Sequence, residues 1–135
     1  MLQGATNVVC RHAPKLIRRQ DAGYPTALND LADPPALLFA LGNEQLLERP
    51  LVAIVGTRNS TAYGERATRN IARELVRAGA CVVSGMARGI DAVAHRTALE
   101  AGGGTVAVLG TGIDVAYPAG HRQLHAAIAA NGLVL

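Results

Sequence analysis

Short apolar runs alternate with longer amphipathic stretches over most of the sequence. Leu51–Val55 is a continuous apolar run between Pro50 and Gly56, which predicts a strand buried on both faces. Similar runs predict strands over residues 80–83, 105–109 and 133–135, and the stretches between them predict helices over residues 65–78, 90–100 and 123–130. Strands and helices alternating at this spacing indicate a parallel sheet with right-handed crossovers. The predicted fold class is therefore α/β, a Rossmann-like three-layer fold with a parallel sheet, present in part because the sequence ends as the fourth strand begins.

The helix expected over residues 65–78 has the clearest amphipathic pattern. Its Ala67, Ile71 and Leu75 recur every four residues and are expected to face the sheet, while the arginines of the same stretch fall on other faces. Gly79 follows at the usual position of a helix terminus.

The residues before this α/β body give weaker signals. Residues 1–23 show little periodicity and scattered charge, so we interpret them as a poorly defined N-terminal segment, either poorly ordered or partial. A short helical stretch is expected around Thr26–Leu31, and the apolar run Ala36–Leu41 ends at Gly42. This run predicts a lead-in hairpin or strand that packs on the α/β body. We place the whole domain, lead-in included, at residues 24–135.

Composition narrows the class of protein. A chain of 135 residues suffices for one domain, and 50% hydrophobic residues with 15 glycines suit a folded α/β protein. Only 3% of the residues are aromatic, so the core must consist of Ala, Val, Leu and Ile. The formal net charge of +3, carried almost entirely by arginine, permits a nucleic-acid partner without requiring one.

The cysteines and the hydropathy pattern bear on location. Cys10 and Cys81 are far apart and match no metal-binding spacing, so no metal site is predicted. No disulfide framework is indicated, and a cytoplasmic location is expected. The sequence contains neither the apolar segment of a signal peptide nor a run of roughly 20 apolar residues, so no membrane partner is expected.

Three loops that follow predicted strands carry the candidate chemistry. They span residues 56–64, 84–89 and 110–120, are rich in glycine and small polar residues, and each leads into a helix. In sheets of this class ligands bind beyond the carboxyl ends of the strands, and helix N-termini there offer free N–H groups and a positive dipole end to phosphates. Three such loops on one edge predict a phosphate-bearing ligand.

The first loop lacks both the G-x-G-x-x-G pattern of dinucleotide folds and the G-x-x-x-x-G-K-S/T pattern of P-loop enzymes. Arg58, two residues past the predicted strand end, is placed to grip a phosphate with two hydrogen bonds, although an exposed loop arginine fits the pattern too. Tyr63 suits either a base-stacking role or packing under the loop.

The second and third loops add further candidates. Gly85 and Gly89 allow a ligand to approach the backbone closely, and Arg88 supplies a second cation. Asp91 falls in a first helical turn, where either the helix dipole or a ligand contact accounts for it. Tyr117 precedes Pro118 and is thereby restricted to extended backbone, which suits a platform for a base.

A hydrolase triad of Ser84, Asp91 and His95 is not supported. Ser84 does not stand in a G-x-S-x-G elbow, and the placement of Asp91 and His95 on one helical face does not bring them to the Ser84 hydroxyl. We expect His95 to be a helix-packing residue.

Taken together, these residues resemble the DprA/Smf family of bacterial DNA-processing proteins. The resemblance rests on Tyr24-Pro25, Asp33-Pro34-Pro35, Gly42, Val55–Arg58, Tyr63-Gly64, Val83–Asp91, Ala94-His95 and Tyr117-Pro118, in that order and spacing. It runs from about Tyr24 to Leu135, and its most specific motif is S-G-x-A-[RK]-G-I-D-x-x-A-H.

The resemblance implies a cytoplasmic protein that binds single-stranded DNA during natural transformation, protects the incoming strand and assists loading of the RecA recombinase. It implies homodimer formation as well, but no catalytic residue, metal or cofactor. It identifies Arg58 and Arg88 as phosphate-gripping cations and Tyr117, more loosely, as an aromatic contact. The full set of expected DNA- or phosphate-binding residues is Gly56, Thr57, Arg58, Ser60, Ser84, Gly85, Ala87, Arg88, Gly89, Gly110, Gly112 and Tyr117.

Two other functions fit the same loops. One is a sensor that binds a free nucleotide. The other is a nucleoside-monophosphate glycosidase similar to the lysine-decarboxylase-like family, although the P-G-G-x-G-T-x-x-E motif of that family is absent from this sequence. The family members that the chain resembles usually continue past this point, so surfaces for dimers and RecA are expected to be incomplete.

Overall fold

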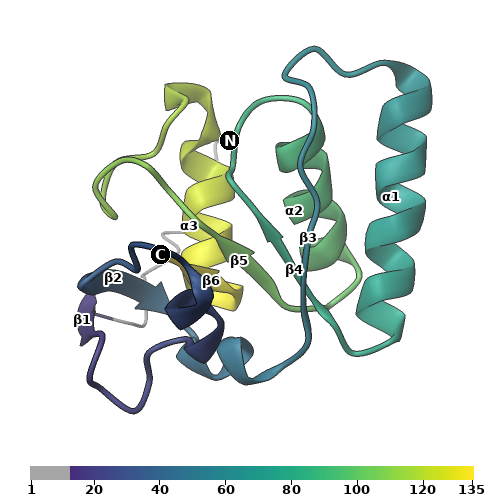
Figure 1. Ribbon diagram of the computed structural model, residues 1–135. Helices are drawn as coiled ribbons and strands as arrows, with labels where there is room; N and C mark the ends of the chain where they lie inside the picture. The colour runs from purple at the N-terminus through teal and green to yellow at the C-terminus, as the bar shows by residue number, and fades with distance from the viewer. Residues whose placement is uncertain (1–12) are drawn as a thin grey trace, which may run out of the picture.

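A computed structural model describes residues 13–135 of the chain, and these residues form one mixed sheet with three α-helices packed on it (Figure 1). The order of strands across the sheet is β1-β2-β6-β5-β4-β3. The strands are β1 (Lys15–Arg18), β2 (Leu37–Gly42), β3 (Leu51–Ala53), β4 (Cys81–Ser84), β5 (Thr105–Ala107) and β6 (Leu133–Val134). The α-helices are α1 (Ala62–Arg77), α2 (Ile90–Glu100) and α3 (Arg122–Asn131).

The parallel part of the sheet agrees with the sequence prediction. Strands β3, β4, β5 and β6 pair in parallel, in sequence order, through the crossovers α1, α2 and α3. Helix α2 has the predicted bounds, whereas α1 begins three residues earlier than expected. It begins there because the Thr61 side chain accepts a hydrogen bond from the Gly64 amide at 3.1 Å and so caps the helix.

Two antiparallel strands complete the sheet. The predicted apolar run 36–41 forms β2, which pairs with β6 through Leu41 and Val134. β1 pairs with β2, so interpreting residues 1–23 as a poorly defined segment is wrong for Lys15–Arg18. Residues 1–12 of that segment, including Cys10, lie outside the described residues.

Different layers cover the two faces of the sheet. On one face, Val82, Ala107 and Val134 pack against the three α-helices. On the other, Val106 and Leu133 pack against the lead-in segment, which contains the 3-10 helices η1 (Thr26–Asp30) and η2 (Glu44–Glu48). The α/β fold class is therefore confirmed, and the lead-in that was only loosely predicted forms a layer of it. None of the helices in residues 13–135 has the length and apolar character needed to cross a bilayer.

Two burial predictions are wrong. All residues of β3 are exposed although the sequence predicted a strand buried on both faces, because β3 is the edge strand of the sheet within the described residues. In α1 the buried residues are Thr68 and Ala72, while Ile71 is 54% exposed. The helix is thus rotated from the predicted stripe, since it packs against α2 as well as the sheet.

Candidate functional site

The three predicted loops meet at one edge of the sheet, beyond the carboxyl ends of β3, β4 and β5 (Figure 1). Between them lies a cavity of about 360 Å³, which we call the loop cavity. It is lined by Arg58, Gly85, Ala87, Arg88, Gly110, Thr111, Tyr117 and Pro118. Residues from all three loops therefore contribute to a single concave surface.

Six of the twelve predicted binding residues line this cavity: Arg58, Gly85, Ala87, Arg88, Gly110 and Tyr117. The Tyr117 side chain is 64% exposed, and the Tyr117–Pro118 peptide bond is cis. The sequence prediction missed Thr111 and Pro118 as lining residues. Both belong to the third predicted loop, so their position in the chain was the only signal for them.

The other six predicted residues do not line the cavity; they support its walls. The Ser84 hydroxyl donates to the Ile54 carbonyl at 2.6 Å, and the Ser60 hydroxyl donates to Glu65 at 2.9 Å. The Thr57 hydroxyl accepts from the Asn59 amide at 3.1 Å. These three hydroxyls are therefore engaged within the protein.

The remaining three residues are glycines at close approaches. At Gly56 a Cβ would lie 2.7 Å from Ile90, and at Gly112 it would lie 3.0 Å from Asp114. At Gly89, where φ is +80°, a Cβ would overlap the Thr57 carbonyl oxygen. Gly56 and Gly89 thus let the first and second loops pack against each other.

The electrostatics of the loop cavity favour an anion. Of the described residues that line it, Arg58 and Arg88 carry a positive charge and none carries a carboxylate. Neither arginine forms an ion pair within residues 13–135, where the pairs are Lys15–Glu44, Arg69–Glu65 and Arg77–Glu74. Hydrogen bonds from Ser60 and Arg69 lower the pKa of Glu65, which keeps that carboxylate committed to α1. The two cavity guanidinium groups are therefore available to a ligand.

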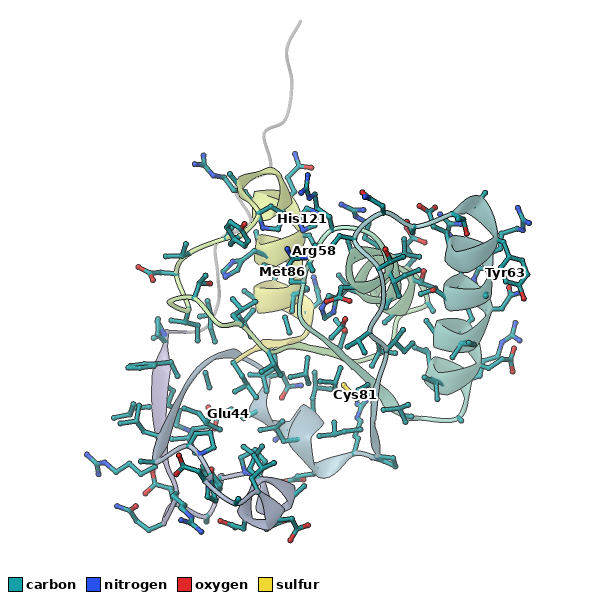
Figure 2. All side chains as sticks on the ribbon, turned by 45° about the horizontal axis from the view of Figure 1, so that its top comes forward. Glu44, Arg58, Tyr63, Cys81, Met86 and His121 are labelled. Atoms are coloured by element: carbon teal, nitrogen blue, oxygen red, sulfur yellow. The ribbon has the colours of Figure 1, made fainter. Side chains whose placement is uncertain are left out.

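The second loop is held from below by two buried side chains. Asp91 is 6% exposed, and its Oδ2 accepts hydrogen bonds from the amides of Gly85 at 3.2 Å and Ala87 at 3.4 Å. The other is His121, whose Nδ1–H donates to the Met86 carbonyl at 2.9 Å. Met86 is fully buried and has a φ of +59°, a conformation that non-glycine residues seldom adopt. Figure 2 shows Arg58, Met86 and His121 gathered at this end of the molecule.

His95 packs beneath the site, as the sequence predicted. It is fully buried, and its Nδ1 lies 2.7 Å from the Thr105 hydroxyl. That hydroxyl donates to the Val82 carbonyl at 2.9 Å, so it accepts from a protonated His95 Nδ1. Burial lowers the pKa of His95 to about 4, despite the opposing charge of Asp91. With Ser84 bound to Ile54, the residues Ser84, Asp91 and His95 do not form a hydrolase triad.

Tyr63 lies away from the loop cavity. Its side chain is 74% exposed, and Figure 2 shows it on the outer side of α1, far from Arg58. Neither a base-stacking role in this site nor packing under the loop agrees with that position.

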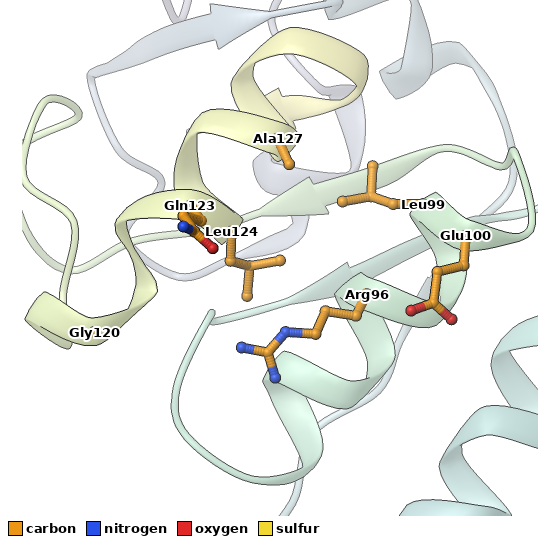
Figure 3. Close-up of a pocket in the computed structure, with 7 residues that line it drawn as sticks. All are labelled: Arg96, Leu99, Glu100, Gly120, Gln123, Leu124 and Ala127. Carbon is orange, nitrogen blue, oxygen red and sulfur yellow. The ribbon is translucent and has the colours of Figure 1, made fainter. Parts of the chain in front are cut away.

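A second hollow of about 260 Å³ lies between α2 and α3 (Figure 3). Its lining residues are Arg96, Leu99, Glu100, Gly120, Gln123, Leu124 and Ala127. Arg96 and Glu100 give it charges of both signs, and none of the twelve predicted binding residues contributes to it. It lacks the uniformly positive character of the loop cavity.

Fold and site together define a class of protein. A mostly parallel α/β sheet carries glycine-rich loops at the carboxyl ends of its strands. Two arginines that form no ion pair within residues 13–135 line the cavity between these loops. This is a Rossmann-like domain with a cavity lined by two arginines at the carboxyl ends of its strands.

The particular family follows from comparison with known proteins. Residues 15–135 match the model of the DNA recombination-mediator protein A family, and the chain belongs to that family. It is 46% identical over 126 residues to Protein Smf of Synechocystis, and 44% identical over 119 residues to the DNA processing protein DprA of Streptococcus pneumoniae. The resemblance noted in the sequence is thereby confirmed.

Solved structures agree with the fold. The crystal structure of S. pneumoniae DprA superposes with a TM-score of 0.84 at 40% identity, covering 89% of this chain and 42% of that one. The structure of DprA from Helicobacter pylori, which concerns its single-stranded DNA binding mode, superposes with a TM-score of 0.81 at 35% identity, covering 93% of this chain and 55% of that one.

The chain matches only part of each relative. The match with Synechocystis Smf includes 90% of this chain and 32% of that protein. The match with S. pneumoniae DprA includes 85% of this chain and 40% of that protein. The family match over residues 15–135 contains all three loops of the candidate site.

Proposed function

We propose that this domain binds single-stranded DNA in the loop cavity and performs no catalysis there. The observation that carries the proposal is that Arg58 and Arg88, which form no ion pair within the described part of the chain, line one cavity together with the exposed ring of Tyr117. Single-strand binders combine a cationic groove for the backbone with aromatic rings on which bases stack. The H. pylori relative, whose structure concerns single-stranded DNA binding, supports the choice of ligand.

Membership of the family supports a proposal about the wider role. We propose that the protein acts in the cytoplasm during DNA uptake and recombination, protecting an incoming strand and assisting RecA. The partners that we propose for this role are RecA and a second copy of the chain. The loop cavity supplies the strand-binding part of that role.

A free-nucleotide sensor is the second candidate. The same two arginines serve a mononucleotide as well as a strand, so the cavity by itself favours neither. Dependence on length separates the two functions, because a strand binder gains affinity as an oligomer extends across the loops.

The proposal is tested by fluorescence anisotropy with labelled thymidine oligomers of increasing length, with duplex DNA and free nucleotide as competitors. Affinity is expected to rise with oligomer length and to exceed that for duplex DNA. Affinity that is independent of length, with efficient competition by a mononucleotide, would establish the sensor instead.

Arg58→Ala tests the site itself. Loss of one charge-assisted phosphate contact, about 1.5 kcal/mol, is expected to weaken oligomer binding roughly tenfold for every base sequence. Arg73→Ala, which removes an exposed arginine of α1, is the matched control and is expected to leave affinity unchanged. Equal affinities of Arg58→Ala and the wild-type protein would exclude Arg58 from the site.

A further inference from the structure

The second loop has the appearance of an anion cradle, but two of its amides are already occupied. A glycine-rich loop that leads into a helix ordinarily offers its N–H groups to a ligand phosphate. Here the amides of Gly85 and Ala87 donate to the buried carboxylate of Asp91. The protein's own anion thus takes these two positions.

The loop is built around this carboxylate. Gly85 has no side chain, and a Cβ there would lie 3.1 Å from Asp91 Oδ2, so the carboxylate fits directly beneath the glycine. His121 holds the Met86 carbonyl between the two amides, and Met86 takes its left-handed backbone conformation there. Alternate peptide groups of the loop are therefore bound from below, the amides by an anion and the carbonyl by an imidazole N–H.

We infer that Asp91 is an internal counter-anion that stands in for a bound phosphate and shapes the loop before any ligand arrives, so that the cavity takes the phosphodiesters of a strand through arginine side chains and not a terminal phosphate through the loop backbone. This inference rests on the proposed function and specifies its ligand class. Asp91 is a positioning residue, since it contacts the loop and does not line the cavity.

The charge of the ligand decides between the two kinds of phosphate. A terminal phosphate carries a charge of about −1.5 to −2 near neutral pH and is best held by several converging N–H groups. Those of Gly85 and Ala87 are engaged with Asp91, whose negative charge repels a second anion at the same place. A phosphodiester carries a single charge, and a guanidinium fork such as that of Arg58 or Arg88 binds it with two parallel hydrogen bonds.

The first test follows the backbone amides of the wild-type protein by ¹⁵N NMR during titration with inorganic phosphate and, separately, with thymidine monophosphate. The Gly85 and Ala87 amide signals are expected to stay in place with both ligands. Saturable movement of these two signals with phosphate would overturn the inference, because it would show that the amides are open to an external anion.

The second test removes the internal anion. In Asp91→Ala the two amides lose their acceptor, and inorganic phosphate is expected to restore it, seen as a saturable rise in Tm and a saturable shift of the Gly85 and Ala87 signals. The wild-type protein and Asp33→Ala, which removes an exposed aspartate of the lead-in, are expected to lack this response. An equal phosphate response in all three proteins, or no rescue of Asp91→Ala, contradicts the role assigned to Asp91.

These outcomes are separable from the proposed function. Strand binding is read by anisotropy with oligomers, while the state of the loop is read with phosphate alone. Failure of oligomers to bind, with unresponsive amides in the wild-type protein and rescue of Asp91→Ala, would reject the proposed function and retain the internal anion. Oligomer binding together with phosphate-responsive amides in the wild-type protein would retain the proposed function and reject the internal anion.

Discussion

At the scale of single residues, burial sets the protonation of two side chains in the centre of the domain. Cys81 is fully buried in β4, and burial raises the pKa of its thiol to about 11 against a smaller opposing effect of Arg49. His95 is buried on the helical side of the same strand and is held neutral. Neither group takes part in the proposed binding, so both report on the fold.

Cys81 is expected to resist alkylation by iodoacetamide at pH 8 in the folded protein. The thiolate is the reactive form, and a pKa near 11 lowers its population roughly a hundredfold from that of an ordinary cysteine, before exclusion of the reagent is considered. Mass spectrometry of the peptide containing Cys81 measures the extent of reaction. Rapid labelling without urea would show that this strand is open to solvent.

His95 makes the stability of the protein depend on pH. Its folded pKa of about 4 lies below the ordinary value of 6.5, so the unfolded state binds more protons between these values. The stabilisation is complete above pH 6.5 and is lost as the pH falls toward 4, by about 3 kcal/mol in all. Urea unfolding at a series of pH values measures this loss.

His95→Gln provides the control for that measurement. The free energy of unfolding of the variant at pH 7.5 is expected to be lower by about 1–3 kcal/mol, because the Thr105 hydroxyl loses its hydrogen bond with the imidazole and the packing around the buried ring changes. Its stability is expected to vary less than that of the wild-type protein between pH 6.5 and 4. The same pH dependence in both proteins would assign the effect to other groups.

At the scale of elements, the packing of one loop against another builds the site. The first and second loops touch where Gly89 meets the Thr57 carbonyl, and the Ile90 amide donates to that carbonyl at 3.2 Å. Gly79, in the turn between α1 and β4, has nearly the same φ of +79°, but nothing lies within 4 Å of the position of its absent Cβ. A comparison of substitutions at the two glycines therefore distinguishes the cost of the left-handed backbone conformation from the cost of a steric clash.

Gly89→Ala is expected to abolish oligomer binding and to destabilise the protein well beyond Gly79→Ala. Both substitutions force a Cβ into the left-handed region, at a cost of roughly 1–2 kcal/mol. Only Gly89→Ala adds a clash with the neighbouring loop. Urea unfolding and anisotropy are measured on both variants, and equal effects would mean that the loops move apart without cost.

The sequence predicted the elements whose signals are local. Helix α2 is bounded by Gly89 and by the glycines that follow Glu100, so both of its ends were found. The strand β1 was missed because Lys15–Arg18 is a short edge strand with only Ile17 buried, which leaves no periodic pattern. The helix α1 begins before its predicted start because Thr61, which caps it, precedes a first turn that lacks the periodic apolar pattern.

The sequence predicts which loops form the candidate site, but not the side-chain contacts that hold these loops in place. Arg58, Arg88 and Tyr117 follow strands, and the parallel topology brings strand ends to one edge, so their convergence could be predicted. His121 lies more than thirty residues from Met86, and only the packing of α3 beside α2 brings them together. The sequence places Asp91 in a first helical turn, where its carboxylate can favour the helix dipole, contact a ligand or bind the loop. Only the direction of the side chain, toward the Gly85 amide, decides among these roles.

At the scale of the whole molecule, positive charge is spread more widely than the site. The chain has a formal net charge of +3 and a pI of about 9.3, and α1 carries several exposed arginines outside the loop cavity. If the domain binds DNA as proposed, long-range attraction would come from the whole domain and specific contacts from the loops.

The salt dependence of oligomer binding distinguishes these contributions. With two phosphates contacted by Arg58 and Arg88, the slope of log K against log salt is expected to be about −1.4. Replacing Arg66 and Arg73 of α1 with alanine is expected to leave the slope unchanged, whereas Arg58→Ala reduces it by about 0.7. A steeper slope that falls in the α1 variants would show that the strand runs over that helix.

The central position of β6 has a kinetic consequence. This strand lies between β2 and β5, so Leu41 pairs with Val134, a residue that lies 93 positions later in the sequence. The hairpin of β1 and β2 therefore has no sheet to join until residues 133–134 are available. Closing so long a loop is entropically costly, and high contact order slows folding. On a ribosome the N-terminal strands would thus wait, unpaired on one side, until residues 133–134 have been synthesised.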